Sequence, residues 1–251
     1  MNMLTQAFRM ILIRLHKRYE PFVTTYPGFP CTVIDKSSFI SAYKEIFERE
    51  IYKFQTANPK PRIIDCGANI GLSVLYFKKL YPGAAITTFE PDPKALAALR
   101  ANVAAINASD VTIIPHAVAG SDGILQFFSE GADGGRVSTE HDTTSIISIT
   151  TERLSPHLSK EVDFLKIDIE GSELEVLEEA QGSLGKVRAI FVEYHSLASK
   201  PQELDRIIAI LSAAGFRYYI EHTGVKSENA FIKRENHLNY DLQLNIFGYR
   251  G

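Results

Sequence analysis

From Pro61 onward, short apolar segments alternate with segments whose apolar residues recur at helical spacing. The short segments predict buried β-strands and the spaced ones predict amphipathic helices, a pattern typical of an α/β fold with a mostly parallel, doubly wound sheet. The predicted strands lie at residues 61–66, 85–89, 111–114, 189–195, 216–220 and 242–249, and within residues 163–171. No long helical pattern separates the last two strands, so we expect them to pair antiparallel.

Helix starts and ends support this division. Asp92 followed by Pro93 is a typical N-cap and first helical position, and Ser172 with Glu175 predicts a capping box for a later helix. We expect another helix to begin at Pro201 and to end at Gly215.

The first 60 residues do not follow the alternation. Residues 31–34 predict one short strand, and residues 38–54 predict an amphipathic helix with an aromatic face. Residues 58–61 are rich in proline, and here we place the boundary between an N-terminal helical extension (residues 1–60) and the main domain (residues 61–251).

Residues 3–18 predict an amphipathic, basic helix. Its apolar residues at helical spacing are Leu4, Phe8, Ile11, Leu12 and Leu15. We expect this helix to pack on its own domain or on a second subunit. The alternative is a peripheral position on a membrane surface near a lipid-linked substrate.

Residues 118–150 also interrupt the alternation. They predict two strands, at 124–128 and 144–150, joined by a polar, glycine-containing segment at 129–142. A loop of this length beside a ligand site is either a mobile lid or ordinary surface, and we favour the lid.

The segment 61–73, PRIIDCGANIGLS, predicts a strand, a tight turn and a helix. Gly67 allows a backbone conformation closed to other residues and a close approach by a ligand. The following helix points its unpaired N–H groups into the turn, which suits an anionic or carboxylate-bearing cofactor. Glu90 ends the next strand about 20 residues later, where an acid binds ribose hydroxyls. His116 and Ala117 end the third strand and should lie near the base of the same nucleoside.

Charged residues stand at the ends of two further strands. Lys166 and Asp168 share one face of the first, and Glu170 continues that direction if the strand persists. Glu193 and His195 share one face of the second. Charges in a core strand cost several kcal/mol unless they are paired or serve a site. We therefore expect an active site here, with a purely structural Lys166–Asp168 ion pair as the alternative.

Three segments together resemble the FkbM family of S-adenosylmethionine-dependent methyltransferases: DCGANIG at 65–71, FEP at 89–91 and FLKIDIEGSE at 164–173. The resemblance covers residues 61–196 and extends into residues 39–54. It implies a Rossmann-like class I methyltransferase fold, with a seven-stranded, mostly parallel sheet whose last strand is antiparallel. It also implies O-methylation of a hydroxyl on a sugar, glycan or polyketide-type small molecule.

With the resemblance, the candidate site residues form two groups. The cofactor-binding group for S-adenosylmethionine comprises Asp65, Gly67, Ala68, Asn69, Gly71, Leu72, Ser73, Glu90, Pro91, His116, Ala117 and Asp168. The catalytic group comprises Lys166, Asp168, Glu193 and His195. Glu193 and His195 are the candidates for proton removal and orientation, since methyl transfer to a hydroxyl must remove its proton. Asp168, Glu193 and His195 could alternatively bind a divalent metal, but their spacing is no signature, so a metal is the less favoured alternative.

Composition narrows the classes of function. The chain has 251 residues, 45% of them hydrophobic, and a net charge of −3, so no basic excess favours nucleic acid as a partner. Two cysteines are too few for a disulfide framework, no apolar run is long enough to cross a membrane, and no cleavage site follows the apolar residues 10–13. We expect a cytoplasmic protein, and the oligomeric state stays open.

Alternative functions remain at this point. The two glycines of the turn fit poorly to the three-glycine dinucleotide fingerprint, which disfavours a nicotinamide-dependent oxidoreductase. A methyltransferase acting on an amino group, nucleic acid or protein is another alternative. A catalytically silent binding module is disfavoured by the charged strand ends.

Overall fold

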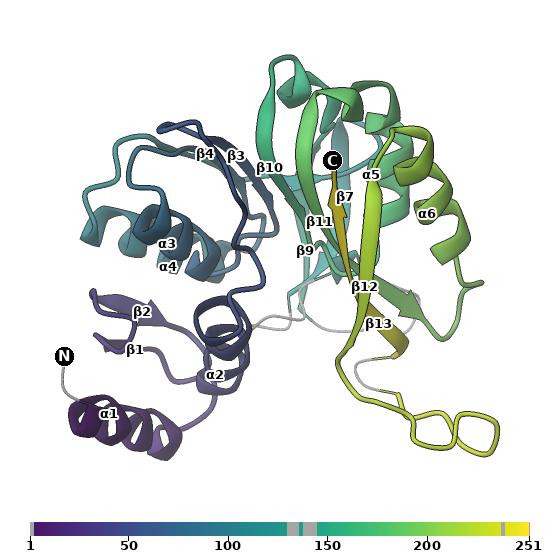
Figure 1. Cartoon of the computed structure of the whole chain (residues 1–251). Coiled ribbons are helices and arrows are strands. Elements are labelled where there is room, and N and C mark those ends of the chain that lie inside the picture. Colours follow the sequence, from purple (N-terminus) through teal and green to yellow (C-terminus); the bar gives the residue numbers. More distant parts are fainter. Residues whose placement is uncertain (1–2, 130–135, 138–144, 237–238, 251) are drawn as a thin grey trace.

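A seven-stranded sheet forms the centre of the computed structural model, which describes residues 3–129, 136–137, 145–236 and 239–250 (Figure 1). Its strands are β3 (Arg62–Cys66), β4 (Ala85–Phe89), β5 (Val111–Ile114), β10 (Val162–Ile167), β11 (Val187–Leu197), β12 (Arg217–Thr223) and β13 (Tyr240–Tyr249). They lie in the order β12-β13-β11-β10-β3-β4-β5, and β13 runs in the opposite direction to the other six strands. The predicted fold, with its last strand antiparallel, is confirmed.

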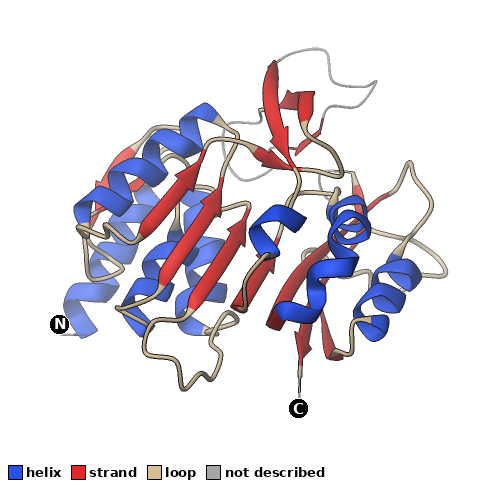
Figure 2. Cartoon of the chain, turned by 90° about the horizontal axis from the view of Figure 1, so that it is seen from above, coloured by secondary structure: helices blue, strands red, loops and turns tan. Residues whose placement is uncertain are grey.

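Helices cover both faces of this sheet (Figures 1 and 2). One side carries α3 (Leu72–Leu80) and α4 (Pro93–Ala105), and the other carries α5 (Glu173–Ala180) and α6 (Leu204–Ala213), with short 3₁₀ helices at η2 (Ser155–Leu158) and η3 (Gln181–Lys186). Because strand side chains alternate between faces, neighbouring residues such as Ile63 and Ile64 enter separate hydrophobic clusters.

Two of the predicted helix starts need correction. Asp92 caps α4 as expected, since its side chain accepts hydrogen bonds from the backbone N–H groups of Lys94 and Ala95. The capping box is wrong: Ser172 makes no side-chain cap bond, and Glu175 instead accepts from Gly120 N at 3.1 Å. Helix α6 begins at Leu204 rather than at Pro201.

The N-terminal segment contains α1 (Met3–Leu15), β1 (Phe22–Thr24), β2 (Cys31–Val33), α2 (Lys36–Tyr43) and the π-helix η1 (Lys44–Glu48). The predicted helix at 38–54 is too long, because Glu50 has a φ of 55° and turns the chain. Tyr52 lies beyond this turn and packs against Phe164 and Phe191. It is therefore apolar because of these contacts, and its spacing from the preceding apolar residues resembled a longer helix by coincidence. The strand β1 was not predicted.

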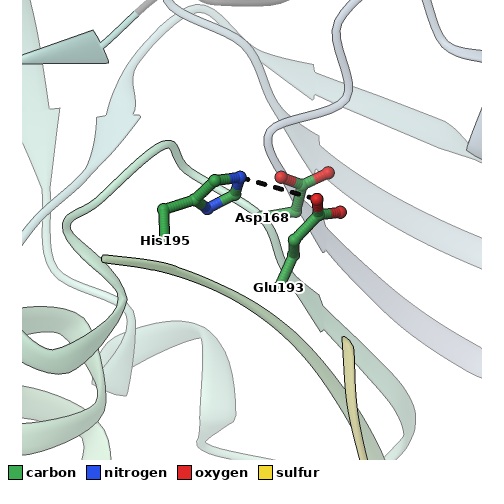
Figure 3. Close-up of side chains that lie close together, drawn as sticks. All are labelled: Asp168, Glu193 and His195. Atoms are coloured by element: carbon green, nitrogen blue, oxygen red, sulfur yellow. Dashed lines mark ion pairs between the residues drawn. The ribbon is translucent and has the colours of Figure 1, made fainter. Parts of the chain in front are cut away.

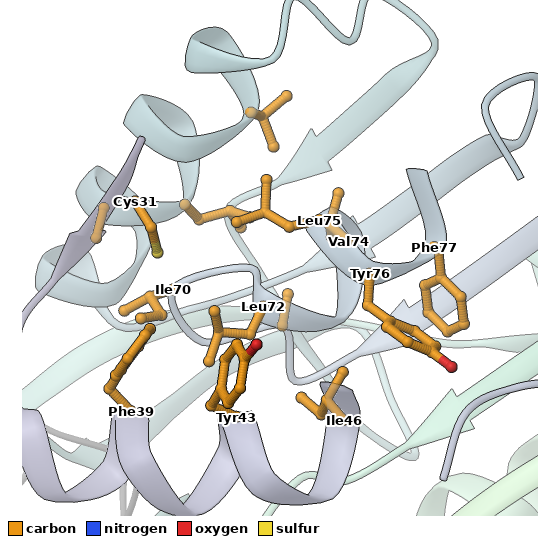
Figure 4. Packing of buried hydrophobic residues seen from close by; sticks show 14 of the residues in the cluster. Cys31, Phe39, Tyr43, Ile46, Ile70, Leu72, Val74, Leu75, Tyr76 and Phe77 are labelled. Atoms are coloured by element: carbon orange, nitrogen blue, oxygen red, sulfur yellow. The ribbon is translucent and has the colours of Figure 1, made fainter. Parts of the chain in front are cut away.

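Helix α2 packs against α3 in the same hydrophobic cluster as the main sheet (Figure 4). Phe39 and Tyr43 of α2 and Ile46 of η1 are buried there with Leu72 and Tyr76 of α3. The division at residue 60 stays a prediction.

The face of helix α1 that packs on the rest of the chain differs from the expected one. Ile13 is buried, whereas Phe8, Ile11, Leu12 and Leu15 are 51–76% exposed. These four apolar side chains are therefore left largely uncovered by the described part of the chain. Contact of this face with a second subunit, or with a membrane surface as the alternative, stays a prediction. None of the helices in the described ranges has both the length and the apolar character needed to cross a membrane.

A second sheet follows β5 along the chain. It consists of β6 (Ala117–Val118), β7 (Gly123–Phe128), β8 (Arg136–Val137) and β9 (Ile146–Glu152), in the order β6-β9-β7-β8. The two predicted strands correspond to β7 and β9, the latter ending two residues later than expected. Most of the proposed lid at 129–142 lies outside the described residues.

Candidate active site

The turn after β3 is held in shape by left-handed backbone conformations. Gly67 and Gly71 have φ angles of 86° and 85°, and Asn69 has a φ of 50°. A Cβ atom at Gly67 would lie 1.8 Å from the carbonyl oxygen of Asp168, so this glycine allows the ends of β3 and β10 to meet. The end of β10 thus makes one close approach to this turn, and the approach of a ligand to Gly67 stays a prediction.

The N–H groups of this turn are mostly used within the protein. Gly67 N and Ala68 N donate to Phe89 O at 3.1 and 3.0 Å, and Asn69 N donates to Glu90 Oε2 at 2.7 Å. These contacts tie the turn to the end of β4. Within residues 67–74, the backbone N–H groups best placed to bind a ligand are therefore those at the start of α3, which have no partners within the helix.

A cavity of about 580 Å³ opens beside the turn. This volume lies within the usual range for small-molecule sites. Ten of the twelve predicted cofactor-binding residues line it: Gly67, Ala68, Asn69, Leu72, Ser73, Glu90, Pro91, His116, Ala117 and Asp168. The carboxyl ends of β3, β4, β5 and β10 therefore contribute to one site.

Asp65 and Gly71 do not line this cavity. Asp65 is fully buried behind it, where it accepts a hydrogen bond from Ser73 Oγ at 2.5 Å and lies 3.3 Å from Lys166 Nζ. Gly71 packs against Leu99, whose Cδ1 would be 2.5 Å from an added Cβ. Both residues shape the site from behind.

Glu90 is a buried acid on the cavity wall. Its two carboxylate oxygens accept from Asn69 N at 2.7 Å and from Asp92 N at 2.8 Å. Burial outweighs these hydrogen bonds and raises the pKa of Glu90 to about 7. The carboxyl group can therefore change its charge near neutral pH.

Lys166 is the buried cation of the site. Its Nζ lies 3.1 Å from Asp168 Oδ2 and donates to Gly67 O at 2.8 Å. Burial favours the neutral amine, but the carboxylates of Asp168 and Asp65 outweigh it and raise the pKa of Lys166 well above its usual value. Lys166 thus remains protonated and cannot act as a base.

His195 and Glu193, both on β11, lie next to Asp168 (Figure 3). His195 Nε2 is 3.5 Å from Glu193 Oε1, and its Nδ1 is 3.0 Å from Glu173 Oε1. Burial disfavours the charged imidazole, but Glu170 and Glu173 outweigh it and raise the pKa of His195 well above its usual value. The His195 side chain is only 1% exposed and does not line the cavity, whereas Glu193 does.

Glu170 and Glu173 were not among the predicted site residues. Strand β10 ends at Ile167, and Glu170 has a φ of 58°, so the predicted continuation of the strand face does not occur. Glu170 lines the cavity, and burial followed by the nearby Asp168 and Glu193 carboxylates raises its pKa to about 8 against the opposing effect of His195. Burial, then Asp168, also raises the pKa of Glu193.

The other walls of the cavity come from segments without a readable motif. They include Ser38, Ser41 and Glu45 before and within η1, Phe127 in β7, and Val225 and Tyr240 near the C-terminal strands. No local pattern in the sequence marks these residues, because only the packing of distant segments brings them together.

The family model described as "Methyltransferase FkbM domain" matches residues 65–218. The chain is 32% identical over 214 residues to methyltransferase sdnD of Sordaria araneosa, covering 69% of this chain and 80% of that protein. It is 28% identical over 157 residues to the 2-O-methyltransferase NoeI of Sinorhizobium fredii, covering 54% of this chain and 64% of that protein. It is 26% identical over 217 residues to the 31-O-demethyl-FK506 methyltransferase FkbM of Streptomyces tacrolimicus, covering 71% and 82%.

Solved structures agree at the level of the fold. The methyltransferase FkbM of Methylobacillus flagellatus has a TM-score of 0.54 at 19% identity, over 81% of this chain and 47% of that one. TYW2 of M. jannaschii in complex with AdoMet has a TM-score of 0.50 at 15% identity, over 94% and 90%. Taken with the site geometry and the match over residues 65–218, these similarities show that the chain is an enzyme belonging to the FkbM family of methyltransferases.

Proposed function

We propose that this enzyme transfers a methyl group from S-adenosylmethionine to a hydroxyl of a sugar, glycan or polyketide-type small molecule. The observation that carries the proposal is the convergence of the ends of β3, β4 and β5 on one cavity, with the Glu90 carboxylate in its wall. Ligands of open α/β sheets bind at such carboxyl ends.

The cavity wall suits the three parts of the cofactor. The start of α3, at Leu72 and Ser73, faces the methionine carboxylate, and Glu90 accepts hydrogen bonds from the ribose hydroxyls. His116 and Ala117 lie beside the base. When bound, the cofactor supplies the methyl group on a positively charged sulfur.

The acceptor lies on the side of the cavity where Asp168 and Glu193 face inward. Glu193 accepts the hydroxyl proton, because its raised pKa makes it a stronger base than an ordinary carboxylate. His195 is a positioning residue that contacts Glu193 from outside the cavity. The extension (residues 1–60) and residues near Val225 and Tyr240 determine which acceptor fits.

The acceptor class draws support from the names of two relatives, a 2-O-methyltransferase and a 31-O-demethyl-FK506 methyltransferase. A net charge of −3 gives no support to a phosphate backbone as partner. An amino group or a protein as acceptor is the alternative that substrate screening would reveal.

Titration calorimetry with S-adenosylhomocysteine tests the cofactor, with NAD as a parallel control. We expect binding of S-adenosylhomocysteine alone. Transfer of a labelled methyl group from S-adenosylmethionine onto a panel of sugars and polyketides then tests the acceptor. Binding of NAD alone would overturn the proposal, and label recovered on amine compounds only would replace the acceptor class.

The affinity for S-adenosylhomocysteine should depend on pH through Glu90. Below a pKa of about 7 the carboxyl group is neutral and accepts hydrogen bonds from ribose less well, so the affinity should rise with pH. We expect an increase of about tenfold between about pH 6 and about pH 8. Glu90→Gln should bind more weakly and lose this dependence, and calorimetry across the range measures both. An unchanged pH profile in Glu90→Gln would assign the titration to another group.

A further inference from the structure

A histidine and two carboxylates from two neighbouring strand ends form a compact group of potential metal ligands (Figure 3). Asp168 lies just past the end of β10, and Glu193 and His195 lie on β11. One ligand atom of each residue lies within 4.8 Å of the other two. Ligands bound to one ion at about 2.0–2.2 Å lie about 3–4.4 Å apart, so only small side-chain shifts separate this arrangement from a coordinated one.

The imidazole of His195 is oriented as in a metal ligand. Its Nδ1 faces Glu173 Oε1 at 3.0 Å, and the same oxygen accepts from Gly171 N at 2.9 Å. A carboxylate held in this way fixes the proton on Nδ1 and turns Nε2 toward the site, as second-shell carboxylates do for metal-binding histidines.

The contacts of Nε2 are weak as hydrogen bonds. Glu193 Oε1 and Glu170 Oε2 both lie 3.5 Å from it, longer than an ordinary N–H···O hydrogen bond. Separations of this size are usual between atoms that share one ion. Nε2 therefore lies near the carboxylates of Glu193 and Glu170 without a short hydrogen bond to either.

Acidic side chains outnumber basic ones around Asp168, Glu193 and His195. The buried ion pairs join Lys166 and His195 to five carboxylates, those of Asp65, Asp168, Glu170, Glu173 and Glu193. Buried charges of one sign are stable only when opposite charge compensates them. Protons on carboxyl groups such as that of Glu170 are one source of that charge, and a divalent cation in the place of the second proton on the imidazole is another.

A separate observation comes from the neighbouring strand. Asn245 on β13 lies directly opposite Glu193, and opposed residues of antiparallel strands place their side chains on the same face. Asn245 is fully buried, and among the described residues neither its Oδ1 nor its Nδ2 has a hydrogen-bond partner. A polar amide beside Glu193 suits the water shell of an ion.

We propose that Asp168, Glu193 and His195 bind one divalent cation at the acceptor end of the cavity. Mixed oxygen and nitrogen ligands suit a first-row ion such as Mn²⁺. Asp168 and Glu193 line the cavity, so the ion keeps an open position toward it. Its role rests on the proposed function: it binds the acceptor hydroxyl and lowers the pKa of that group. Glu193 binds the ion through one oxygen and accepts the hydroxyl proton on the other; with the ion bound, the lowered pKa of the hydroxyl, in place of the raised pKa of Glu193, favours this transfer.

Binding of Mn²⁺ to the purified full chain, followed by electron paramagnetic resonance and calorimetry without cofactor, tests this proposal. We expect one Mn²⁺ per chain and an affinity at least about tenfold lower in Glu193→Gln and in His195→Gln. Glu152→Gln is the matched control, because Glu152 also contacts two histidines, His116 and His157, but lies outside the ligand group. It should bind Mn²⁺ like the unmodified protein.

Titration with S-adenosylhomocysteine, run beside it, separates this proposal from the proposed function. Cofactor binding without Mn²⁺ binding would overturn the cation site and leave the proposed function standing. Mn²⁺ binding that neither Glu193→Gln nor His195→Gln weakens would also overturn it, since the ion would then lie elsewhere. Loss of Mn²⁺ binding in either variant, with cofactor binding retained, supports it.

Discussion

Gly67→Ala is expected to destabilise the protein by about 3 kcal/mol or more and to weaken binding of S-adenosylhomocysteine at least about tenfold. Two effects combine. The backbone φ of 86° is unfavourable for alanine, and the added Cβ would lie 1.8 Å from the backbone carbonyl oxygen of Asp168. Because a backbone oxygen cannot rotate away, the ends of β3 and β10 must separate, which disturbs the cavity wall.

Gly182→Ala is the matched control for this substitution. Gly182 lies in η3, and an added Cβ there has no atom within 4 Å. Thermal unfolding should show a fall in Tm of about 10 °C for Gly67→Ala and little change for Gly182→Ala. A Gly67→Ala protein with unchanged Tm and cofactor affinity would contradict the close approach of the two strand ends.

Lys166→Met should cost about 3–5 kcal/mol of stability and remove most of the methyltransferase activity. The substitution removes the cation between Asp65 and Asp168, whose oxygens lie 3.3 and 3.1 Å from Nζ. Asp65 is then left as a buried, uncompensated charge. Asp168 loses the contact that holds it at the cavity wall.

Urea unfolding of a double variant tests this explanation. Lys166→Met with Asp65→Asn should be more stable than the sum of the two single effects, because no buried charge is left at position 65. Lys53→Met is the control for losing a lysine ion pair, since Lys53 and Glu50 form an exposed pair that water screens, so its loss should leave stability nearly unchanged. Strict additivity in the double variant would show that Lys166 and Asp65 do not interact.

The alternation of strands and helices after residue 61 was predictable from the sequence, because the spacing of apolar residues is a local property. The antiparallel last strand followed from the lack of a helix between two strands. The N-cap at Asp92 was also predictable, because capping depends only on neighbouring residues. Predictions failed where apolar residues continued a spacing for another purpose, as Tyr52 does beyond the end of η1.

Most of the candidate cofactor residues could also be named from the sequence. Turns after parallel strands meet at one edge of the sheet, so a glycine turn, Glu90 and His116 had to be neighbours once the strands were known. The charged residues at the end of β10 stood out from its apolar pattern, and the family resemblance then placed Asp168 in the cofactor group. None of this required knowledge of the packing.

Only the tertiary structure decided which of these side chains face the cavity. Asp65 and Lys166 are 101 residues apart in number, yet they form one buried ion pair. His195 faces Glu173 behind the cavity, and Glu193, two residues away, faces inward. Local periodicity states which face of a strand a residue occupies, but its partner, its exposure and its charge depend on what other segments pack there. For this protein, sequence periodicity alone determined the sheet and the edge that carries the site. Packing across the sheet determined the chemistry of each group within it.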